Sequence, residues 1–453
     1  MNKFIETIKN IWKIDELRGR ILFTLLILAV YRLGSFIVLP GVNPEVLDTA
    51  SQGGSGQGLL GLINIFTGGA FNKGAIFALG IMPYITASII IQLLGFAVPY
   101  FQRLQQKEGE SGRKKITQIT RLLTVAITLV QGSGYLAYIT SQGAMSPHIP
   151  QSIFWFSNII ILASGTIFAM WLGEKITDRG IGNGISLLIM IGIIASLPGA
   201  FIAEVQAKFA GTPLILIIEF AAFFLVVVAT ILIVQGVRRI PIQFAKRMVG
   251  RSTGDLPTAG ARDFIPLKVN AAGVMPIIFA QAIMFLPLTI AQFFNENAAA
   301  ESTFLASLND WKSIPYNVVF FLLVVVFTYV YTALLVNPQQ YSEYLKRQNS
   351  FIPGIKPGSQ TQDYIDTLTT RITLPGSIFL GLISILPAFI AKFGVNDAFA
   401  LFFGGTSLLI LVGVVLDTLQ QIESYLLMRK YDGLVKSGRL KGRSGMQQIG
   451  ASF

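Results

Sequence analysis

The chain contains no cysteine and only one histidine among its 453 residues. Without cysteine it can form neither a disulfide nor a thiolate site. The histidine, His148, lies in a short S-P-H-I-P segment, where a solvated side chain is the simplest interpretation. The sequence also lacks a G-x-x-x-x-G-K-[ST] phosphate loop, a metal-ligand spacing and a Ser/His/Asp arrangement. These absences predict a protein that is not an enzyme and that uses no metal or other cofactor.

Charged residues are scarce as well, at 13% of the chain, whereas 53% of the residues are hydrophobic. Globular domains carry about 25% charged residues, so this chain is expected to bury much of its surface in lipid. Apolar runs of the length that crosses a bilayer as a helix, about 20 residues, occur ten times. We therefore predict an all-α integral membrane protein with ten transmembrane helices. The predicted spans are 21–39, 74–97, 121–140, 153–172, 184–203, 213–236, 271–292, 315–336, 373–391 and 401–427.

The basic residues are distributed unevenly between the two sides that these spans define. If both termini lie on one side, all but five of the 35 basic residues fall on that side, and the positive-inside rule places it in the cytoplasm. Residues 1–20 are expected to form a cytoplasmic amphipathic helix or a solvated leader, without the pattern of a cleavable signal peptide. Residues 431–453 are expected to form a cytoplasmic tail. The five exceptions are Arg32, Lys73, Lys208, Lys312 and Lys392.

Two thirteen-residue stretches of the chain are versions of each other. Ala78 to Ile90 reads A-L-G-I-M-P-Y-I-T-A-S-I-I, and Ala271 to Ile283 reads A-A-G-V-M-P-I-I-F-A-Q-A-I, with seven identical positions at a constant offset of 193. Each pattern predicts an apolar helix interrupted by a glycine and a proline. The stretches fall in the second and the seventh span, and because five is odd the second half is inserted upside down. We predict two inverted five-helix halves, 21–205 and 206–430, with a pathway between them.

The charges within the spans limit what this pathway could carry. A secondary transporter, the main alternative, needs a polar site near the middle of the membrane, whereas Arg32, Glu219 and Asp417 do not form a cluster. Arg32 and Glu219 could pair, or neighbouring groups could satisfy each of them. Isoleucines at helical spacing could instead close a constriction that excludes water, or could be ordinary core residues. These isoleucines are Ile81, Ile85, Ile185, Ile189 and Ile278.

A short apolar segment precedes the second span. It runs from Leu59 to Phe71, is too short to cross a membrane, and follows the flexible linker G-G-S-G-Q-G at 53–58. A short helix on a tether beside a pathway suggests a movable plug. A re-entrant or interfacial helix that does not move is the alternative.

Five motifs of the chain are long and specific. They are I-T-D-R-G-I-G-N-G-I-S (176–186), R-R-I-P-I-Q-F-A-K-R (238–247), A-L-G-I-M-P-Y-I-T-A-S-I-I-I-Q-L-L (78–94), Q-Q-Y (339–341) and F-G-G-T-S-L-L-I (403–410). Together they resemble the SecY family, the channel subunits of the bacterial protein-export translocon. The resemblance runs from about Trp12 to Lys441.

This resemblance implies an hourglass channel in the bacterial cytoplasmic membrane, closed by a ring of apolar side chains and by a plug helix. Matched by position, the plug falls on about 59–71. A lateral gate between the second and seventh spans would let signal sequences and membrane spans reach lipid. Phe285 and Leu286 reverse the order of aromatic and aliphatic residues that is usual at this gate. The implied residues are, for the ring, Ile81, Ile85, Ile185, Ile189, Ile278 and Ile410; for the plug, Leu62, Asn64, Phe66, Gly68 and Gly69; and for the gate, Ser88, Gln92 and Gln281.

Two basic cytoplasmic arms, 237–270 and 337–372, carry the partner contacts that the resemblance implies. In the family such arms dock the SecA ATPase or the ribosome, and a basic surface suits acidic proteins and rRNA phosphates alike. Charges that only fix the topology are the alternative for most loop bases. SecE-like and SecG-like membrane subunits, signal peptides, nascent chains and membrane lipid are the other implied partners. The docking residues are Arg238, Arg239, Lys246, Arg247 and Arg251 in the first arm, and Lys346, Arg347 and Lys356 in the second, with Lys356 at a position where the family commonly has arginine.

Overall fold

The computed structural model describes residues 12, 14–52, 59–106, 109–209, 213–244, 262–294, 307 and 310–436. Each of the ten predicted spans coincides with a helix in this part of the chain. In order they are α2 (Asp15–Gly34), α5 (Met82–Ala97), α7 (Gly109–Ser141), α8 (Gln151–Arg179), α9 (Gly184–Phe209), α10 (Pro213–Val234), α11 (Met275–Phe294), α14 (Ile314–Leu335), α16 (Ser359–Lys392) and α18 (Gly405–Lys436).

Seven of these helices are long and apolar enough, by length and composition, to cross a membrane: α7, α8, α9, α10, α14, α16 and α18. Besides the ten helices that match predicted spans, the described residues form shorter ones. They are α3 (Pro44–Gln52), α4 (Leu59–Phe66), α6 (Pro99–Gln106), α15 (Pro338–Arg347) and α17 (Asp397–Ala400). Helix α2 begins at Asp15, ahead of the predicted start of the first span at residue 21. Of the two predicted cytoplasmic ends, residues 1–11, 13 and 437–453 lie outside the described residues.

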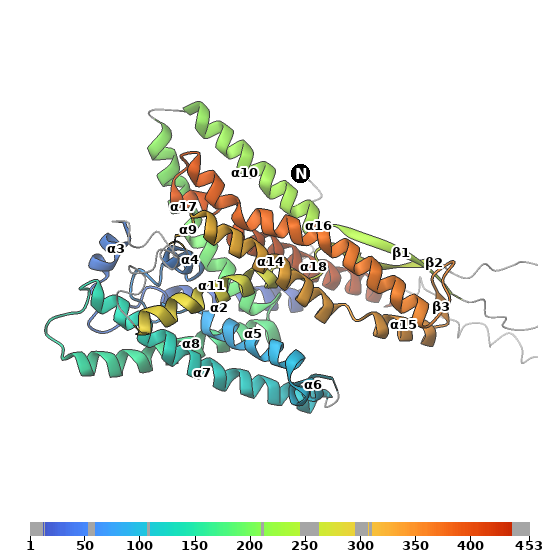
Figure 1. Cartoon of the computed structure of the whole chain (residues 1–453). Helices are drawn as coiled ribbons and strands as arrows, with labels where there is room; N and C mark the ends of the chain where they lie inside the picture. The colour runs from blue at the N-terminus through green and yellow to red at the C-terminus, as the bar shows by residue number, and fades with distance from the viewer. Residues whose placement is uncertain are drawn as a thin grey trace, which may run out of the picture.

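The helices form two groups, shown in Figure 1, with α2, α4, α5, α7 and α8 on one side and α10, α14, α16 and α18 on the other. Between the groups, α9 contacts α10, α17 and α18, while α11 contacts α5 and α7. The exposed apolar side chains are numerous along α10, for example Leu214, Ile217 and Leu225. Such a surface is expected where lipid, rather than water, surrounds a helix.

The sequence suggested that each repeated stretch forms an interrupted helix, and this prediction is wrong. The glycine of each stretch precedes its helix and has a positive φ, +53° for Gly80 and +64° for Gly273. Helices α5 and α11 then begin at the methionine, so that Pro83 and Pro276 lie in the first turn. Proline is tolerated there because its missing N–H would have no partner within the helix. The repeat is therefore a turn that starts a helix, used once in each half.

The two basic arms meet in a small sheet, which the prediction of an all-α protein did not include. Strands β1 (Val237–Phe244), β2 (Arg262–Lys268) and β3 (Ser350–Phe351) pair antiparallel in the order β2-β1-β3. Figure 1 shows this sheet beyond one end of the helices, next to α15. A separate apolar core joins the strands to α15 and α16; its buried members are Ile240, Ile242, Leu267, Leu345, Ile352 and Ile365.

Candidate functional site

The six isoleucines of the predicted ring all lie in the apolar core between the two groups of helices. They come from α9, α11, α18 and the start of α5, where the Ile85 N–H donates to the Ile81 carbonyl at 3.1 Å. Ile185 and Ile278 are partly buried against this core. The four buried members are Ile81, Ile85, Ile189 and Ile410.

The predicted plug is folded as a short helix followed by turns. Helix α4 ends at Phe66, and the Gly69 N–H donates to the Asn64 carbonyl at 2.8 Å. The Asn64 side chain in turn accepts a hydrogen bond from the Asn72 N–H at 3.0 Å. Ile65 and Phe66 pack in the same core as the ring isoleucines. The side chain of Leu62 lies outside the described residues.

Arg32 and Glu219, which the sequence allowed to pair, have separate partners. The Arg32 Nη1 atom donates to the Gly68 carbonyl at 2.8 Å, so the arginine of α2 contacts the turn that follows α4 in the plug. Glu219 of α10 accepts a hydrogen bond from Lys208 of α9. Satisfaction by neighbouring groups, the other expectation, is what the structure shows.

Lys208 also binds a second carboxylate that the sequence analysis missed. Its Nζ atom lies 3.0 Å from Glu204 Oε1, and the Glu204 side chain is completely buried. The other oxygen of Glu204 accepts from the Asn396 N–H at 2.9 Å. The cluster of Glu204, Lys208 and Glu219, hereafter the α9–α10 ion cluster, thus joins the last helix of the first half to two elements of the second. The i, i+4 spacing of Glu204 and Lys208 was a signal that could have found part of it.

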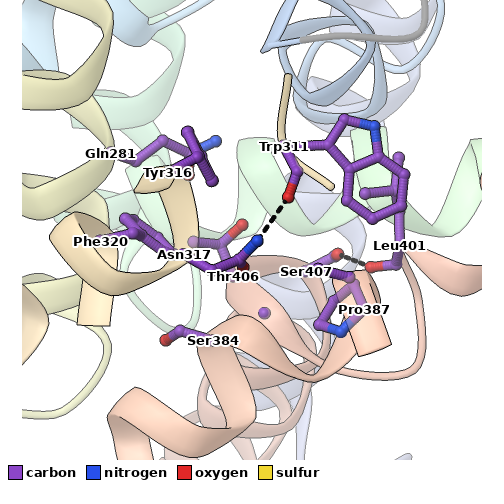
Figure 2. A pocket seen from close by; sticks show the side chains of 12 residues that line it. Gln281, Trp311, Tyr316, Asn317, Phe320, Ser384, Pro387, Leu401, Thr406 and Ser407 are labelled. Atoms are coloured by element: carbon purple, nitrogen blue, oxygen red, sulfur yellow. Dashed lines mark hydrogen bonds between the residues drawn. The ribbon is translucent and has the colours of Figure 1, made fainter. Parts of the chain in front are cut away.

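The residues assigned to the lateral gate fall in two places. Helices α5 and α11 are in contact. On α5, the Gln92 Nε2 atom donates to Ser88 Oγ at 3.2 Å. Gln281 of α11 is buried and lines a pocket formed with α14, α16 and the start of α18, where Figure 2 shows it beside Tyr316. The side chains of Phe285 and Leu286 lie outside the described residues.

The basic residues of the arms point away from the small apolar core. Arg238 and Arg239 are exposed on β1, with the Arg239 guanidinium 4.8 Å from the centre of the Phe264 ring. The predicted docking residues of the second arm are exposed as well: Lys346, Arg347 and Lys356. Of the predicted docking residues, Lys246, Arg247 and Arg251 lie outside the described residues. The described part of the chain holds no group of three or more His, Cys, Asp or Glu that could bind a metal ion.

Comparison with known proteins gives consistent matches. The SecY family model matches residues 75–419. The protein translocase subunit SecY of Streptomyces coelicolor is 44% identical over 440 residues, which covers 94% of this chain and 98% of the relative.

Solved structures match over a similar length. One solved structure matches with a TM-score of 0.62 at 18% identity, covering 90% of this chain and 92% of the other. It is described as showing that the plug domain of the SecY protein stabilises the closed state of the translocation channel and maintains a membrane seal. Sec61 in the canine ribosome-channel complex from the endoplasmic reticulum matches with a TM-score of 0.56 at 17% identity and the same coverage. At such identities these two likenesses concern the fold.

Proposed function

This chain belongs to the SecY family, and we propose that it is the channel subunit through which signal-bearing polypeptides cross a bacterial cytoplasmic membrane. The observation that carries the proposal is the position of α4, which packs against the isoleucine-rich core between the two halves. A short helix that fills the space between two inverted halves suits a conduit that must be closed at rest.

The ring isoleucines supply the seal of this channel. Branched aliphatic side chains exclude water from a narrow constriction, and a dewetted constriction blocks ions. They also form no hydrogen bonds with an extended polypeptide, so cargo of many sequences can pass without being trapped. Ile81 and Ile85 from the first half form this seal together with Ile278 and Ile410 from the second.

The contact between α5 and α11 is the proposed lateral gate. A signal sequence or a membrane span is an apolar helix, which partitions into lipid when these two helices separate. The gate therefore releases such segments sideways, while polar segments pass through the ring. Opening moves one half relative to the other, since the two helices belong to different halves.

The energy and the docking come from partners. The sequence carries no phosphate-binding loop, so a separate ATPase of the SecA type, or the ribosome, drives transport. The exposed bases of the two arms, among them Arg238, Arg239 and Lys356, give these partners an electropositive surface. SecE-like and SecG-like membrane subunits complete the complex, and both termini face the cytoplasm.

Reconstituted transport tests the proposal. The chain, assembled with SecE-like and SecG-like subunits in lipid vesicles, is mixed with SecA, ATP and a precursor that carries a signal sequence. Precursor that becomes protected from added protease has crossed the membrane. A precursor whose signal has lost its apolar core, and a sample without ATP, are the controls. Absence of protected precursor with SecA and also with ribosomes would refute the proposal.

A further inference from the structure

We propose that Arg32 is the latch that holds the plug in its closed position, through its hydrogen bond to the Gly68 carbonyl. The plug is taken here as residues 59–71. The inference rests on the proposed function, because a latch has a purpose only if the plug moves when the channel opens.

The charge of Arg32 matches the end of the helix that it contacts. Gly68 lies in the turn two residues beyond Phe66, the last residue of α4, so the contact brings the Arg32 guanidinium close to the C-terminal end of this helix. The helix dipole favours a positive charge there. Arg32 itself sits in a predicted membrane span, where an arginine is costly and usually marks a functional site. Its guanidinium also lies over the Phe36 ring, 5.1 Å from the ring centre.

Two glycines allow the plug to come this close. Gly68 has a φ of +63°, and a Cβ atom there would lie 2.4 Å from Arg32 Nη1 and 2.9 Å from the Gly192 Cα. A Cβ atom on Gly192 of α9 would lie 2.3 Å from the Phe66 carbonyl oxygen. The turn after α4 therefore rests directly on the backbone of α9. A side chain at Gly192 would force the turn away from α9, and one at Gly68 would also collide with Arg32.

A second contact fixes the base of the plug and leaves the helix end to Arg32. The Tyr135 hydroxyl of α7 donates to the Phe71 carbonyl at 2.6 Å. Phe71 is the last plug residue before the segment that leads into α5. Loss of the Arg32 contact would leave α4 and the turn after it held by packing alone, so that they move more readily, while Tyr135 keeps the base in place. Arg32 is thus a positioning residue for the closed state.

A single engineered cysteine can report the position of the plug, because the natural chain has none. Thr67→Cys places a thiol next to Gly68, at a position that is 1% exposed in the closed state. The complex with its membrane subunits is reconstituted in vesicles, and a membrane-impermeant maleimide labels the thiol. The same complex in planar bilayers gives the resting ion conductance.

In this background Arg32→Gln is expected to raise the labelling rate and the resting conductance. A hydrogen bond to a charged group corresponds to roughly a tenfold to hundredfold change in the ratio of open to closed plug. The matched control is Lys73→Gln. Lys73 has the same charge and lies over the same Phe36 ring, 4.2 Å from its centre. This control is expected to leave both readouts unchanged.

A second variant covers the case in which Arg32→Gln does not assemble. Gly68→Ala keeps every charge but pushes the plug away from Arg32, and it should raise both readouts as well. Unchanged labelling in either assembled variant would overturn the latch, as would a rise in conductance without faster labelling. SecA-driven import by the unchanged chain is measured in parallel, so that failure of the channel proposal, seen as no import, is distinguished from failure of the latch.

Discussion

Replacing Lys208 with methionine is expected to lower the free energy of unfolding by about 3–5 kcal/mol, the usual loss when one partner of a buried ion pair is removed. Methionine keeps most of the length of the lysine stem, so the main change is the loss of the charge. Two carboxylates then face each other without a counter-charge. Glu204 is completely buried, and only 9% of the Glu219 side chain is exposed, so water cannot replace the ammonium group.

The chain provides a matched control for this change. Lys114 and Glu110 in α7 form the same type of pair as Lys208 and Glu204, four residues apart with an N–O distance of 3.0 Å. Their side chains are 73% and 83% exposed, and such surface pairs contribute about 0.3–0.5 kcal/mol. Lys114→Met should therefore cost far less than Lys208→Met, although the geometry is the same.

Denaturant unfolding of the purified chain in detergent micelles, followed by tryptophan fluorescence, measures both losses. Adding Glu219→Gln to Lys208→Met should recover a large part of the stability, because it removes one of the two opposed charges. Equal losses in the two lysine variants would refute the reasoning, because only Lys208→Met leaves two buried carboxylates without a counter-charge.

Three further predictions follow from the site and the fold. Ile85→Asn should hydrate the constriction and raise the resting conductance in planar bilayers; an unchanged conductance at normal expression would contradict the ring. Gly184→Ala should destabilise the chain by about 1–3 kcal/mol, because a Cβ there would lie 1.9 Å from a backbone carbonyl of α8. In the same unfolding assay Gly199→Ala should be harmless, because a Cβ at this position of the same helix would have nothing within 4 Å. Arg239→Gln should slow association with SecA or ribosomes at low salt, and surface plasmon resonance should show no comparable effect of Lys114→Gln on the other half; equal effects would argue against a specific docking arm.

The helices and the family could be predicted from the sequence because both depend on local patterns. Long apolar runs identify membrane spans whatever their neighbours are, and every predicted span contains a helix. The resemblance to the SecY family is confirmed by the family model and by a relative 44% identical over most of the chain. The start of the second span was predicted too early, because Ala75 to Ile81 are as apolar as a span but lie outside α5, which begins at Met82.

The parts that were missed depend on contacts between distant residues. Arg32 contacts Gly68, and Glu204 contacts Asn396, and neither pair has a sequence spacing that would suggest it. The strands of the arms were hidden for another reason. Pro241 and Pro266 lie within β1 and β2, and proline usually argues against a strand. The two-residue spacing of Ile240 and Ile242, both buried, was the signal that could have indicated β1.

The small sheet connects the two arms mechanically. Strand β1 follows α10 and β3 precedes α16, so the pairing of Gln243 with Phe351 ties two loops of the same half together. Ile240, Leu345 and Ile365 add a packed core beneath that pairing. A force applied to either arm is therefore shared among α10, α11, α14 and α16 instead of bending one helix. In the proposed function, a partner that docks on the arms would therefore act on the second half as one body, against its contacts with α5 and α9.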